Sequence, residues 1–284
     1  MKILSFGEII WDVFPTGPLM GGAPFNFAAH ASKEGAAVYM ASSVGNDDLG
    51  AAALKNADKY GVKKDFIGIK EGKKTGQCLV LFDENNQPSY DIVDDVAYDY
   101  IKYNEKMADI EFDAVCFGTL AIRHQHNKDS IKEILNKTKH KEVLTDVNIR
   151  KPFSSKESVL FSLENATILK VSDEELPVVL DYAFSENEPD YKKAAKLLSE
   201  KYKNIGLIIV TLGSKGSYVY DVKNNEEFST GCPDVKVVST VGAGDSFSAA
   251  FLVSYLSGKT IPECLERATE VSTYVVMHEG AIPD

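Results

Sequence analysis

The sequence contains few cysteines and no long apolar run. Its four cysteines are scattered over 284 residues without a Cys-x-x-Cys pair, which favours reduced, partly buried thiols over disulfides or a zinc site. The N-terminal residues reach Glu8 and Asp12 without the apolar stretch of a signal peptide, and no later run approaches the length of a membrane-spanning helix. We therefore expect a cytoplasmic protein that has no membrane partner.

Positive charge is also in short supply. The chain carries 31 Lys and Arg residues against 42 Asp and Glu residues, which gives a formal net charge of -11. The average field of such a protein repels nucleic acids and anionic membranes, so we expect neither as a partner. An anionic substrate must instead bind at a site of positive electrostatic potential, which a helix N-terminus, a divalent cation or a few Arg and Lys side chains can supply.

The common phosphate-binding motifs are missing. There is no Gly-x4-Gly-Lys-Ser/Thr, and neither the His-Arg-Asp nor the Asp-Phe-Gly of protein kinases is present. No Gly-x-Gly-x-x-Gly follows the first apolar run, which makes a dinucleotide oxidoreductase the weakest of the functions considered. Any phosphate site in this chain must therefore rest on another architecture.

Apolar, β-prone runs recur along the chain and alternate with helical patterns. The runs are residues 3–6, 37–44, 114–117, 143–147, 167–171 and 207–211, and the clearest helical patterns are residues 28–33, 49–60 and 190–202. This alternation predicts an α/β fold in which a mainly parallel sheet is covered by helices on both faces.

The alternation is interrupted between Gly76 and Tyr100. Residues 77–82 and 90–93 have the pattern of short strands, and the turn-rich segment 83–88 joins them without a helix nearby. Two strands are too few to be stable alone, so we expect this hairpin to cover the site as a lid or to pair with another subunit. No internal repeat or low-complexity linker interrupts the rest, and we expect one large α/β domain over residues 1–284.

The most informative segment is Ser239-Thr-Val-Gly-Ala-Gly-Asp-Ser-Phe247. Its small residues leave backbone N–H groups unobstructed before a predicted helix at 247–255, whose positive end suits an anion. Asp245 stands beside that anion and could accept the proton of an attacking alcohol. An Asp in a first helical turn also stabilises any helix, so the segment alone leaves a purely structural role open.

Three further positions are candidates for contacts with a polyol. Asn26 follows the glycine-rich stretch 21–24 and offers both a donor and an acceptor, although a loop with Asn26 in an early helical turn is the better explanation of the stretch taken by itself. Asp12 follows the first strand, where ligands gather in parallel sheets, and a carboxylate can bind two sugar hydroxyls. Arg150, after the strand that ends in Asp146, is the best candidate for a phosphate or hydroxyl clamp.

Three later segments have less specific patterns. Carboxylates in the segment 170–175 could hold water ligands of Mg²⁺ where a strand turns into a helix. The glycines of the segment 211–216 allow close approach of a nucleotide, but a hairpin turn explains them about as well. His124 and His126 have no matching ligand pattern elsewhere, so we interpret them as surface or pocket-lining residues.

Two segments together resemble the signatures of the PfkB (ribokinase-like) carbohydrate kinases: "GGAPFNFAAH" near the N-terminus and "STVGAGDSFSAAF" near the C-terminus. The resemblance covers essentially the whole chain, and "GEIIWDVFP", "DVNIRKPF", "VTLGSKGS" and "GAIP" are most similar to bacterial fructokinases. It implies a doubly wound α/β sheet and ATP with Mg²⁺ as phosphoryl donor. It also implies a small β-sheet lid, formed by segments near 11–20 and 76–100, that often mediates homodimerisation.

The resemblance also implies roles for individual residues. Asp245 would be the catalytic base, the backbone of residues 241–244, including Gly242, Ala243 and Gly244, would form the anion hole, and Arg150 would lie near the reacting hydroxyl and the γ-phosphate. The sugar contacts would be Asp12, Gly22, Asn26 and Arg123. The nucleotide would be bordered by Ser172, Thr211, Gly213 and Gly216, and Glu175 would contact Mg²⁺ through water.

The chain departs from the family pattern at two positions. The family's Asn-x-x-Glu motif is Ser172-Asp-Glu-Glu175 here, which predicts a weaker nucleotide contact. Ser239 replaces an Asp that belongs to a monovalent-cation loop in some members, so activation by K⁺ is left open.

The expected function is ATP-dependent phosphorylation of the exocyclic hydroxyl of a ketohexose, from fructose to fructose 6-phosphate. The same chemistry on 2-keto-3-deoxygluconate, ribose or a nucleoside is the nearest alternative, and Tyr90, Tyr98 and Tyr100 of the expected lid are candidates for clamping a nucleobase. A sugar-binding regulator without activity is a third possibility, against which the presence of Asp245 and Glu175 argues.

Overall fold

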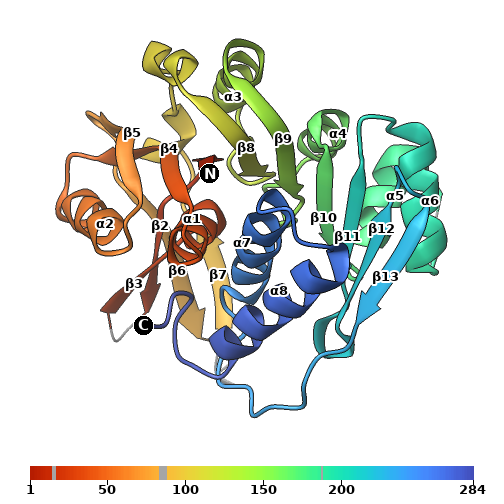
Figure 1. Ribbon diagram of the computed structural model, residues 1–284. Coiled ribbons are helices and arrows are strands. Elements are labelled where there is room, and N and C mark those ends of the chain that lie inside the picture. Colours follow the sequence, from red (N-terminus) through yellow and green to blue (C-terminus); the bar gives the residue numbers. More distant parts are fainter. Residues whose placement is uncertain (15–16, 83–87, 187) are drawn as a thin grey trace.

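The computed structural model describes residues 1–14, 17–82, 88–186 and 188–284, and it is built around one large sheet. The strands of this sheet are β1 (Lys2–Phe6), β4 (Ala37–Gly45), β5 (Lys63–Lys70), β8 (Glu111–Gly118), β9 (Lys139–Asp146), β10 (Ile168–Ser172), β11 (Leu207–Thr211), β12 (Ser217–Asp221) and β13 (Glu226–Thr230). Their order is β13-β12-β11-β10-β9-β8-β1-β4-β5 (Figure 1). All neighbours from β11 to β5 are parallel, whereas β12 and β13 are antiparallel.

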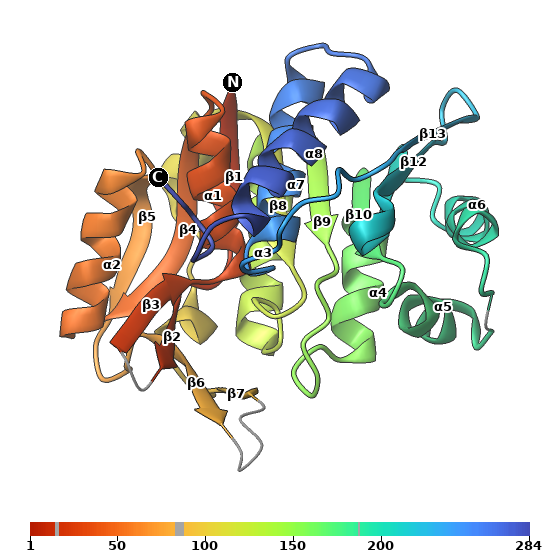
Figure 2. The ribbon, with the colours of Figure 1, turned by 90° about the horizontal axis from the view of Figure 1, so that it is seen from below.

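Helices cover both faces of the large sheet, which confirms the predicted doubly wound α/β fold (Figures 1 and 2). One face packs against α1 (Ala23–Lys33), α2 (Asp48–Lys59), α7 (Ala243–Leu256) and α8 (Ile261–Val276), and the other against α3 (Gln125–Lys137), α4 (Lys156–Asn165), α5 (Leu176–Phe184) and α6 (Tyr191–Lys201). The strands are apolar on both sides for this reason: on β10, Ile168 packs in the core beside α7 and α8, and Leu169 in the core beside α5 and α6.

A second, small sheet lies at the carboxyl end of the large one (Figures 1 and 2). Its strands are β2 (Ile10–Phe14), β3 (Gly17–Gly21), β6 (Gly76–Phe82) and β7 (Pro88–Ile92), in the order β3-β2-β6-β7. The hairpin expected from the sequence corresponds to β6 and β7, and most of its turn, residues 83–87, lies outside the described residues. The strand β2 joins this hairpin through parallel pairing with β6.

Two helices begin earlier than the sequence pattern predicted. The helix α1 starts at Ala23 rather than residue 28, and α7 starts at Ala243 rather than residue 247. Both are capped by glycines with positive φ, Gly22 and Gly242, instead of by the Ser, Thr, Asp or Asn side chains that mark most N-termini. As a result Asn26 and Asp245 both lie within the first turns of helices.

The edge strands were also hard to foresee. Most residues of β5 and β13 are partly or fully exposed, and β5 is rich in Lys whereas β13 begins with two Glu residues, so neither has the apolar run of a buried strand. Within the described part of the chain, none of the helices combines the length and the apolar character needed to cross a bilayer.

Candidate active site

Two glycine-rich segments that are far apart in the sequence meet where α1 and α7 begin. Gly22 caps α1 with a φ of 102°, and a Cβ at this position would lie 2.6 Å from the carbonyl oxygen of Glu8. Only glycine fits such a backbone. Four residues later Asn26 is buried, and its Nδ2 donates a hydrogen bond to Oδ2 of Asp245 at 2.8 Å. The structure therefore brings the predicted sugar contact and the predicted base together.

The first turn of α7 presents backbone N–H groups to a ligand. Gly242 caps the helix with a φ of 81°, and a Cβ there would lie 2.6 Å from the carbonyl oxygen of Ala281. Within the described ranges, the N–H groups of Gly244 and Asp245 have no acceptor, as is usual in a first helical turn. These donors and the positive end of the helix form a site for an anion.

The environment of Asp245 makes its carboxylate more basic than that of an exposed aspartate. Burial raises the pKa of Asp245, and this effect outweighs the hydrogen bond from Asn26 and the positive charges of Lys170 and Arg150, which lower it. A carboxylate with a raised pKa, placed beside free N–H donors, is suited to accept a proton from a hydroxyl group.

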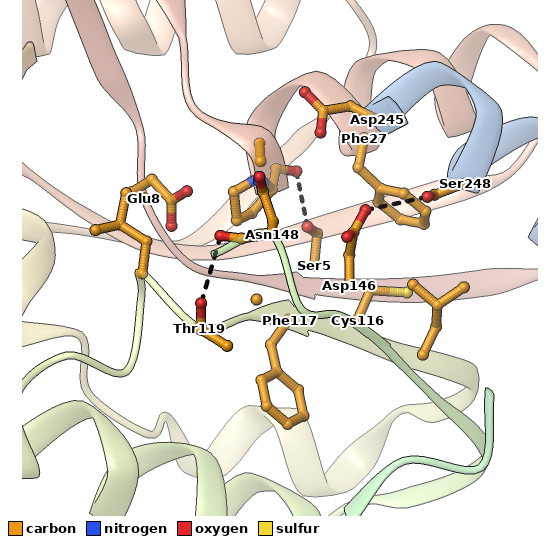
Figure 3. Close-up of a pocket in the computed structure, with 15 residues that line it drawn as sticks. Ser5, Glu8, Phe27, Cys116, Phe117, Thr119, Asp146, Asn148, Asp245 and Ser248 are labelled. Carbon is orange, nitrogen blue, oxygen red and sulfur yellow. Dashed lines mark hydrogen bonds between the residues drawn. The ribbon is translucent and has the colours of Figure 1, made fainter. Parts of the chain in front are cut away.

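A buried ion pair lies under the same turn of α7. The Nζ of Lys170, on β10, is 3.1 Å from Oδ1 of Asp146, at the end of β9, and Oδ2 of Asp146 accepts a hydrogen bond from Oγ of Ser248 at 3.2 Å. The carboxylate of Asp146 is thus held between the sheet and α7 (Figure 3). Burial raises the pKa of Asp146 to about 6, although Lys170 opposes the shift.

The sequence analysis assigned no role to Lys170. Its signal in the sequence was a lysine inside the apolar run Ile-Leu-Lys-Val-Ser of a central strand, where both faces are expected to be buried. A buried lysine needs a charged partner, so the run itself indicated an ion pair. The sequence could not show that this partner is Asp146 or that α7 covers the pair.

A small cavity of about 30 Å³ extends between the ends of β1, β8 and β9 and the start of α7. Glu8, Asp146, Asn148 and Asp245 line it, together with apolar residues (Figure 3). Glu8 is 3% exposed, and its Oε2 has no hydrogen-bond partner among the described residues. Burial, with a smaller contribution from the negative charge of Asp245, raises the pKa of Glu8 to about 7. This carboxyl group also lacked a role in the sequence analysis.

The backbone conformation at Asn148 shapes the side of the cavity that follows β9. Asn148 has a φ of 40°, in the left-handed region that Asn tolerates better than most residues. The chain turns there after the end of β9 and continues to Arg150. Thr119 supports the turn, because its Oγ1 donates to the carbonyl oxygen of Val147 at 2.6 Å.

The predicted sugar contact Asp12 lies on β2 of the small sheet. Its carboxylate is half-buried, and burial raises the pKa of Asp12 while the charge of Arg150 lowers it. Gly21, which pairs with Ile10 on the neighbouring strand β3, leaves space for this side chain, since a Cβ there would lie 3.1 Å from Oδ2 of Asp12. Arg150 itself is exposed and has no ion-pair partner in the described ranges. Its guanidinium therefore has no carboxylate partner in the described ranges, and its charge lowers the pKa of both Asp12 and Asp245.

Arg123 is placed differently from the other predicted sugar contacts. Its guanidinium donates from Nε and Nη2 to the two carboxylate oxygens of Asp99 at 2.8 and 2.7 Å, and from Nη2 to the carbonyl oxygen of Val93 at 2.9 Å. Asp94 and His124 lie next to this pair, and His124 is half-exposed, consistent with the predicted pocket-lining or surface position. The side chains of Asp94, Asp99 and His124 are close enough to hold a metal ion, but the Arg123 guanidinium already occupies the two carboxylates.

The predicted nucleotide residues lie at the ends of β10 and β11. Glu175 accepts hydrogen bonds from the backbone N–H groups of Ile149 at 2.6 Å and Ser172 at 2.8 Å, so both carboxylate oxygens already hold the backbone. This carboxylate also faces the ammonium of Lys170, as does Asp146. Oxygen donors of this kind suit Mg²⁺, and because the Glu175 oxygens are engaged, contact through water fits the residues better than direct ligation.

The segment 211–216 forms a tight connection between β11 and β12. Thr211 ends β11 and pairs with Ser217. A Cβ at Gly216 would lie 1.9 Å from the carbonyl oxygen of Thr230, so this glycine is required by the neighbouring strand whether or not a nucleotide binds. Gly213 has a φ of 56° and open space around its Cα, which leaves its backbone accessible. No described hydrogen bond or ion pair joins these residues to Asp245.

The comparisons with known proteins agree with this architecture. The model of the pfkB family of carbohydrate kinases matches residues 7–284. An uncharacterized sugar kinase of Pyrococcus horikoshii is 30% identical over 90% of this chain and 83% of its own length, and fructokinase-2 of Solanum lycopersicum is 26% identical over 99% of this chain and 92% of its own. The fructokinase of Vibrio cholerae O395, in its apo form, has a TM-score of 0.84 and 21% identity over 98% of this chain and 99% of its own. The same fructokinase has also been solved with fructose, ADP and calcium bound, and that structure has a TM-score of 0.83 and 20% identity over 99% of this chain and 94% of its own. The chain therefore belongs to the pfkB family of carbohydrate kinases and has the ribokinase-like fold.

Proposed function

We propose that this pfkB-family sugar kinase transfers the γ-phosphoryl group of ATP to the exocyclic hydroxyl of a ketohexose, and that its acceptor is fructose, which becomes fructose 6-phosphate. The observation that carries the proposal is the contact between Asn26 and Asp245 beside the free N–H groups of α7. This contact supports the proposal, because Asn26 can hold a sugar hydroxyl beside the carboxylate that is proposed as the base. The fructokinases among the relatives support the choice of acceptor.

In the proposed reaction, Asp245 accepts the proton of the acceptor hydroxyl as its oxygen attacks the γ-phosphorus. The raised pKa of Asp245 favours this step, because a stronger base takes the proton more readily. Asn26 fixes one carboxylate oxygen through its hydrogen bond, which leaves the other oxygen to face the hydroxyl. Asp12 and the backbone at Gly22 bind other hydroxyl groups of the sugar and orient it.

The charge of the transferred group is balanced by donors that are in place before the reaction. The N–H groups at Gly244 and Asp245, with the backbone of Gly242 and Ala243, form the anion hole, and Arg150 adds a cation on the open side. Ser172, Thr211, Gly213 and Gly216 border the nucleotide at the ends of β10 and β11. Bound Mg²⁺ would neutralise the nucleotide phosphates, with Glu175 holding it through water.

The charges at the sugar end favour a neutral acceptor over the acid sugar 2-keto-3-deoxygluconate. Asp12 and Asp245 lie at this end, and Glu8 adds a carboxyl group whose pKa of about 7 leaves it partly ionised at neutral pH. The charge of Arg123 is already matched by Asp99, and Arg150 is one cation against these carboxylates. The carboxylate of an acid sugar would therefore meet more negative than positive charge in the described part of the site. A neutral ketohexose avoids this repulsion.

The tyrosines of the expected lid do not support a nucleoside acceptor. Tyr98 is fully buried against Arg123, and Tyr100 is tied to Asp95 by a hydrogen bond of 2.5 Å. Neither ring is free to stack on a nucleobase in this structure. The side chain of Tyr90 lies outside the described residues.

We also infer that the small sheet covers the sugar and forms the contact of a homodimer. Leu19 on β3 is suited to test this inference, because it is a large apolar side chain of this sheet and is 56% exposed. The change Leu19→Lys is expected to convert a dimer to a monomer in light scattering coupled to size exclusion. A wild-type monomer at micromolar concentration would contradict the dimer without affecting the proposed reaction.

The proposed acceptor is tested by steady-state kinetics with ATP and Mg²⁺ on fructose, ribose, 2-keto-3-deoxygluconate and adenosine, with ADP release as the readout. Fructose is expected to have the highest kcat/KM. A lead of about tenfold for another acceptor, a difference of about 1.4 kcal/mol in transition-state binding, would overturn the choice of sugar and leave the kinase chemistry intact. Sugar binding in calorimetry without ADP release on any acceptor would instead indicate the non-catalytic regulator.

A further inference from the structure

Lys170 is placed beside the anion site by two elements that come from different parts of the chain. It lies on β10, and its side chain, 8% exposed, points to the face of the sheet that α7 covers. A Cβ at Gly244 would lie 3.2 Å from Nζ of Lys170, so the ammonium touches the glycine whose N–H group faces the anion site. A larger residue at position 244 would displace it.

The ammonium has more donors than the described contacts use. An ammonium group carries three N–H bonds, and the one hydrogen bond that Nζ makes in the described part of the chain goes to Oδ1 of Asp146. A buried donor without a partner is costly, so groups of this kind are normally satisfied by water or by a ligand. Two donors of Lys170 are therefore free for a ligand bound at the first turn of α7.

The surrounding charges keep this lysine protonated. Burial lowers the pKa of Lys170, but the carboxylates of Asp146, Glu175 and Asp245 outweigh this effect and leave the pKa above its ordinary value. Three carboxylates thus face one buried ammonium.

We propose that Lys170 is a catalytic residue whose ammonium contacts the non-bridging oxygens of the transferred phosphoryl group beside Gly244. The proposal rests on the phosphoryl transfer proposed above. In that step a bond forms between the acceptor oxygen and the γ-phosphorus, and the bond from the γ-phosphorus to the β–γ bridging oxygen breaks, leaving its electron pair on ADP. The hydroxyl proton passes to Asp245, and Lys170 keeps its proton throughout.

The first test measures nucleotide binding without an acceptor. Calorimetry compares ADP with the β,γ-imido analogue of ATP, both with Mg²⁺, on the wild type and on Lys170→Met, which removes the charge and keeps the length of the side chain. We expect the analogue to lose about tenfold or more in affinity relative to ADP, as for the loss of one charge-assisted hydrogen bond. Equal weakening of both nucleotides, or of neither, would overturn the contact.

This measurement separates the two proposals. It does not depend on the acceptor, so an error in the choice of fructose leaves it unaffected. A wild type that binds neither nucleotide would count against the phosphoryl transfer itself.

The second test measures catalysis with the best acceptor of the panel. Lys170→Met is expected to lower kcat by about 10² or more while KM for the sugar changes little, since the contact is made with the phosphoryl group. Lys170→Arg, which keeps the charge, should recover part of kcat. Lys128→Met is the matched control, because Lys128 is also buried and paired, with Glu157 at 2.8 Å, but lies on α3 on the opposite face of the sheet. A similar loss of kcat in Lys128→Met would show that any broken lysine pair slows the enzyme.

A double variant guards against a simple folding defect. If Lys170 only neutralises Asp146, then Asp146→Asn combined with Lys170→Met should have the same kcat as Asp146→Asn alone. If Lys170 contacts the phosphoryl group, the double variant should fold, as judged by its thermal melt, and remain about 10² slower than Asp146→Asn. Equal kcat values for these two variants would overturn the proposal.

Discussion

Two buried ion pairs lie on opposite sides of the site, and they differ in how fully their charges are used. Arg123 and Asp99 form two parallel hydrogen bonds, and their side chains are 3% and 2% exposed. Lys170 and Asp146 form one bond of 3.1 Å, and further carboxylates face the ammonium. The guanidinium of Arg123 uses Nε and Nη2 and leaves Nη1 without a partner among the described residues. The ammonium of Lys170 makes one described hydrogen bond, which leaves two of its three donors unused, although more than one carboxylate faces it.

The difference corresponds to what each pair connects. Asp99 belongs to the short helix η1 (Ala97–Tyr100), which follows the last strand of the small sheet, whereas Arg123 follows β8 of the large sheet. Their ion pair therefore joins the segment after the small sheet to the large sheet. Lys170 and Asp146 lie on neighbouring strands that the sheet already holds together. A pair that is not needed to join two segments, yet retains unused donors, indicates a site prepared for a ligand. The predictions below test this contrast.

The largest effect is expected on kcat, from the change Asp245→Asn near the pair of Lys170 and Asp146. It keeps the size of the side chain and removes the carboxylate that accepts the proton, so kcat should fall by about 10² to 10⁴ with little change in ATP affinity. Stability should change by no more than about 1 kcal/mol, since a carboxylate at a helix N-terminus contributes about that much. Steady-state kinetics and a thermal melt on one preparation measure both. A variant that keeps more than about a tenth of kcat would contradict the assignment of the base.

For Arg123→Met we expect the reverse: a large loss of stability with little change in kcat. Removing one partner leaves Asp99 buried without its cation, which typically costs about 3 to 5 kcal/mol of unfolding free energy. Combining it with Asp99→Asn should recover part of that loss, because no charge is then left unpaired. Urea unfolding measures the stability, and kcat of the folded fraction should stay near that of the wild type. A stable Arg123→Met with a strongly raised KM for the sugar would instead indicate that Arg123 contacts the sugar, as the resemblance implies.

A smaller, pH-dependent effect is expected for Glu8→Gln. Because the pKa of Glu8 is raised from 4.5 to about 7 in the folded protein, the folded state binds a proton that the unfolded state has lost between these pH values. Wild-type stability from this group is therefore present at low pH and lost as pH rises toward 7. The variant lacks this loss, so its stability relative to the wild type should increase by up to about 3 kcal/mol between pH 4.5 and 8. Unfolding curves across this range measure it, and a difference that is constant with pH would show that Glu8 is not buried as described.

The smallest effect concerns monovalent cations near α7. Ser239 accepts a hydrogen bond from the N–H group of Val241 at 3.2 Å and supplies no carboxylate to a cation. We expect weak or no saturable activation when KCl is titrated at constant ionic strength, and stronger dependence in Ser239→Asp. Strong activation of the wild type would show that backbone carbonyls suffice to hold the ion. It would also add a third cation near the phosphoryl group, where we otherwise propose that Lys170 and Arg150 supply the positive charge.

The central strands of the fold could be predicted because parallel strands are buried on both faces and appear as short apolar runs. The starts of α1 and α7 could not, because their caps depend on the backbone of Gly22 and Gly242 rather than on a capping side chain. The polar edge strands β5 and β13 were missed because an exposed strand has no distinctive pattern.

In the site, sequence motifs located the residues near the backbone turns but gave little information about charge pairing. Asp245 and Asn26 stand in glycine-rich segments, which mark them. Lys170 lies in a strand, and only the packing of α7 over it shows that its ammonium is buried near Gly244. The resemblance assigned Arg123 to the sugar end, but its partner Asp99 is 24 residues away and could be identified only in the structure.

The parallel pairing of β2 with β6 also has a consequence for the order of folding. Ile10 lies opposite Gly76, and the chain between them forms α1, β4, α2 and β5 before it returns. Bringing two such distant segments together costs loop-closure entropy until the intervening elements have folded. We therefore expect pulse-labelling hydrogen exchange to show protection of β1 and β4 before that of β2 and β6. The small sheet, which is proposed to cover the sugar, would then form only after the large sheet has folded. If the large sheet folds slowly, the first consequence would be a protein that lacks its binding site for the acceptor sugar.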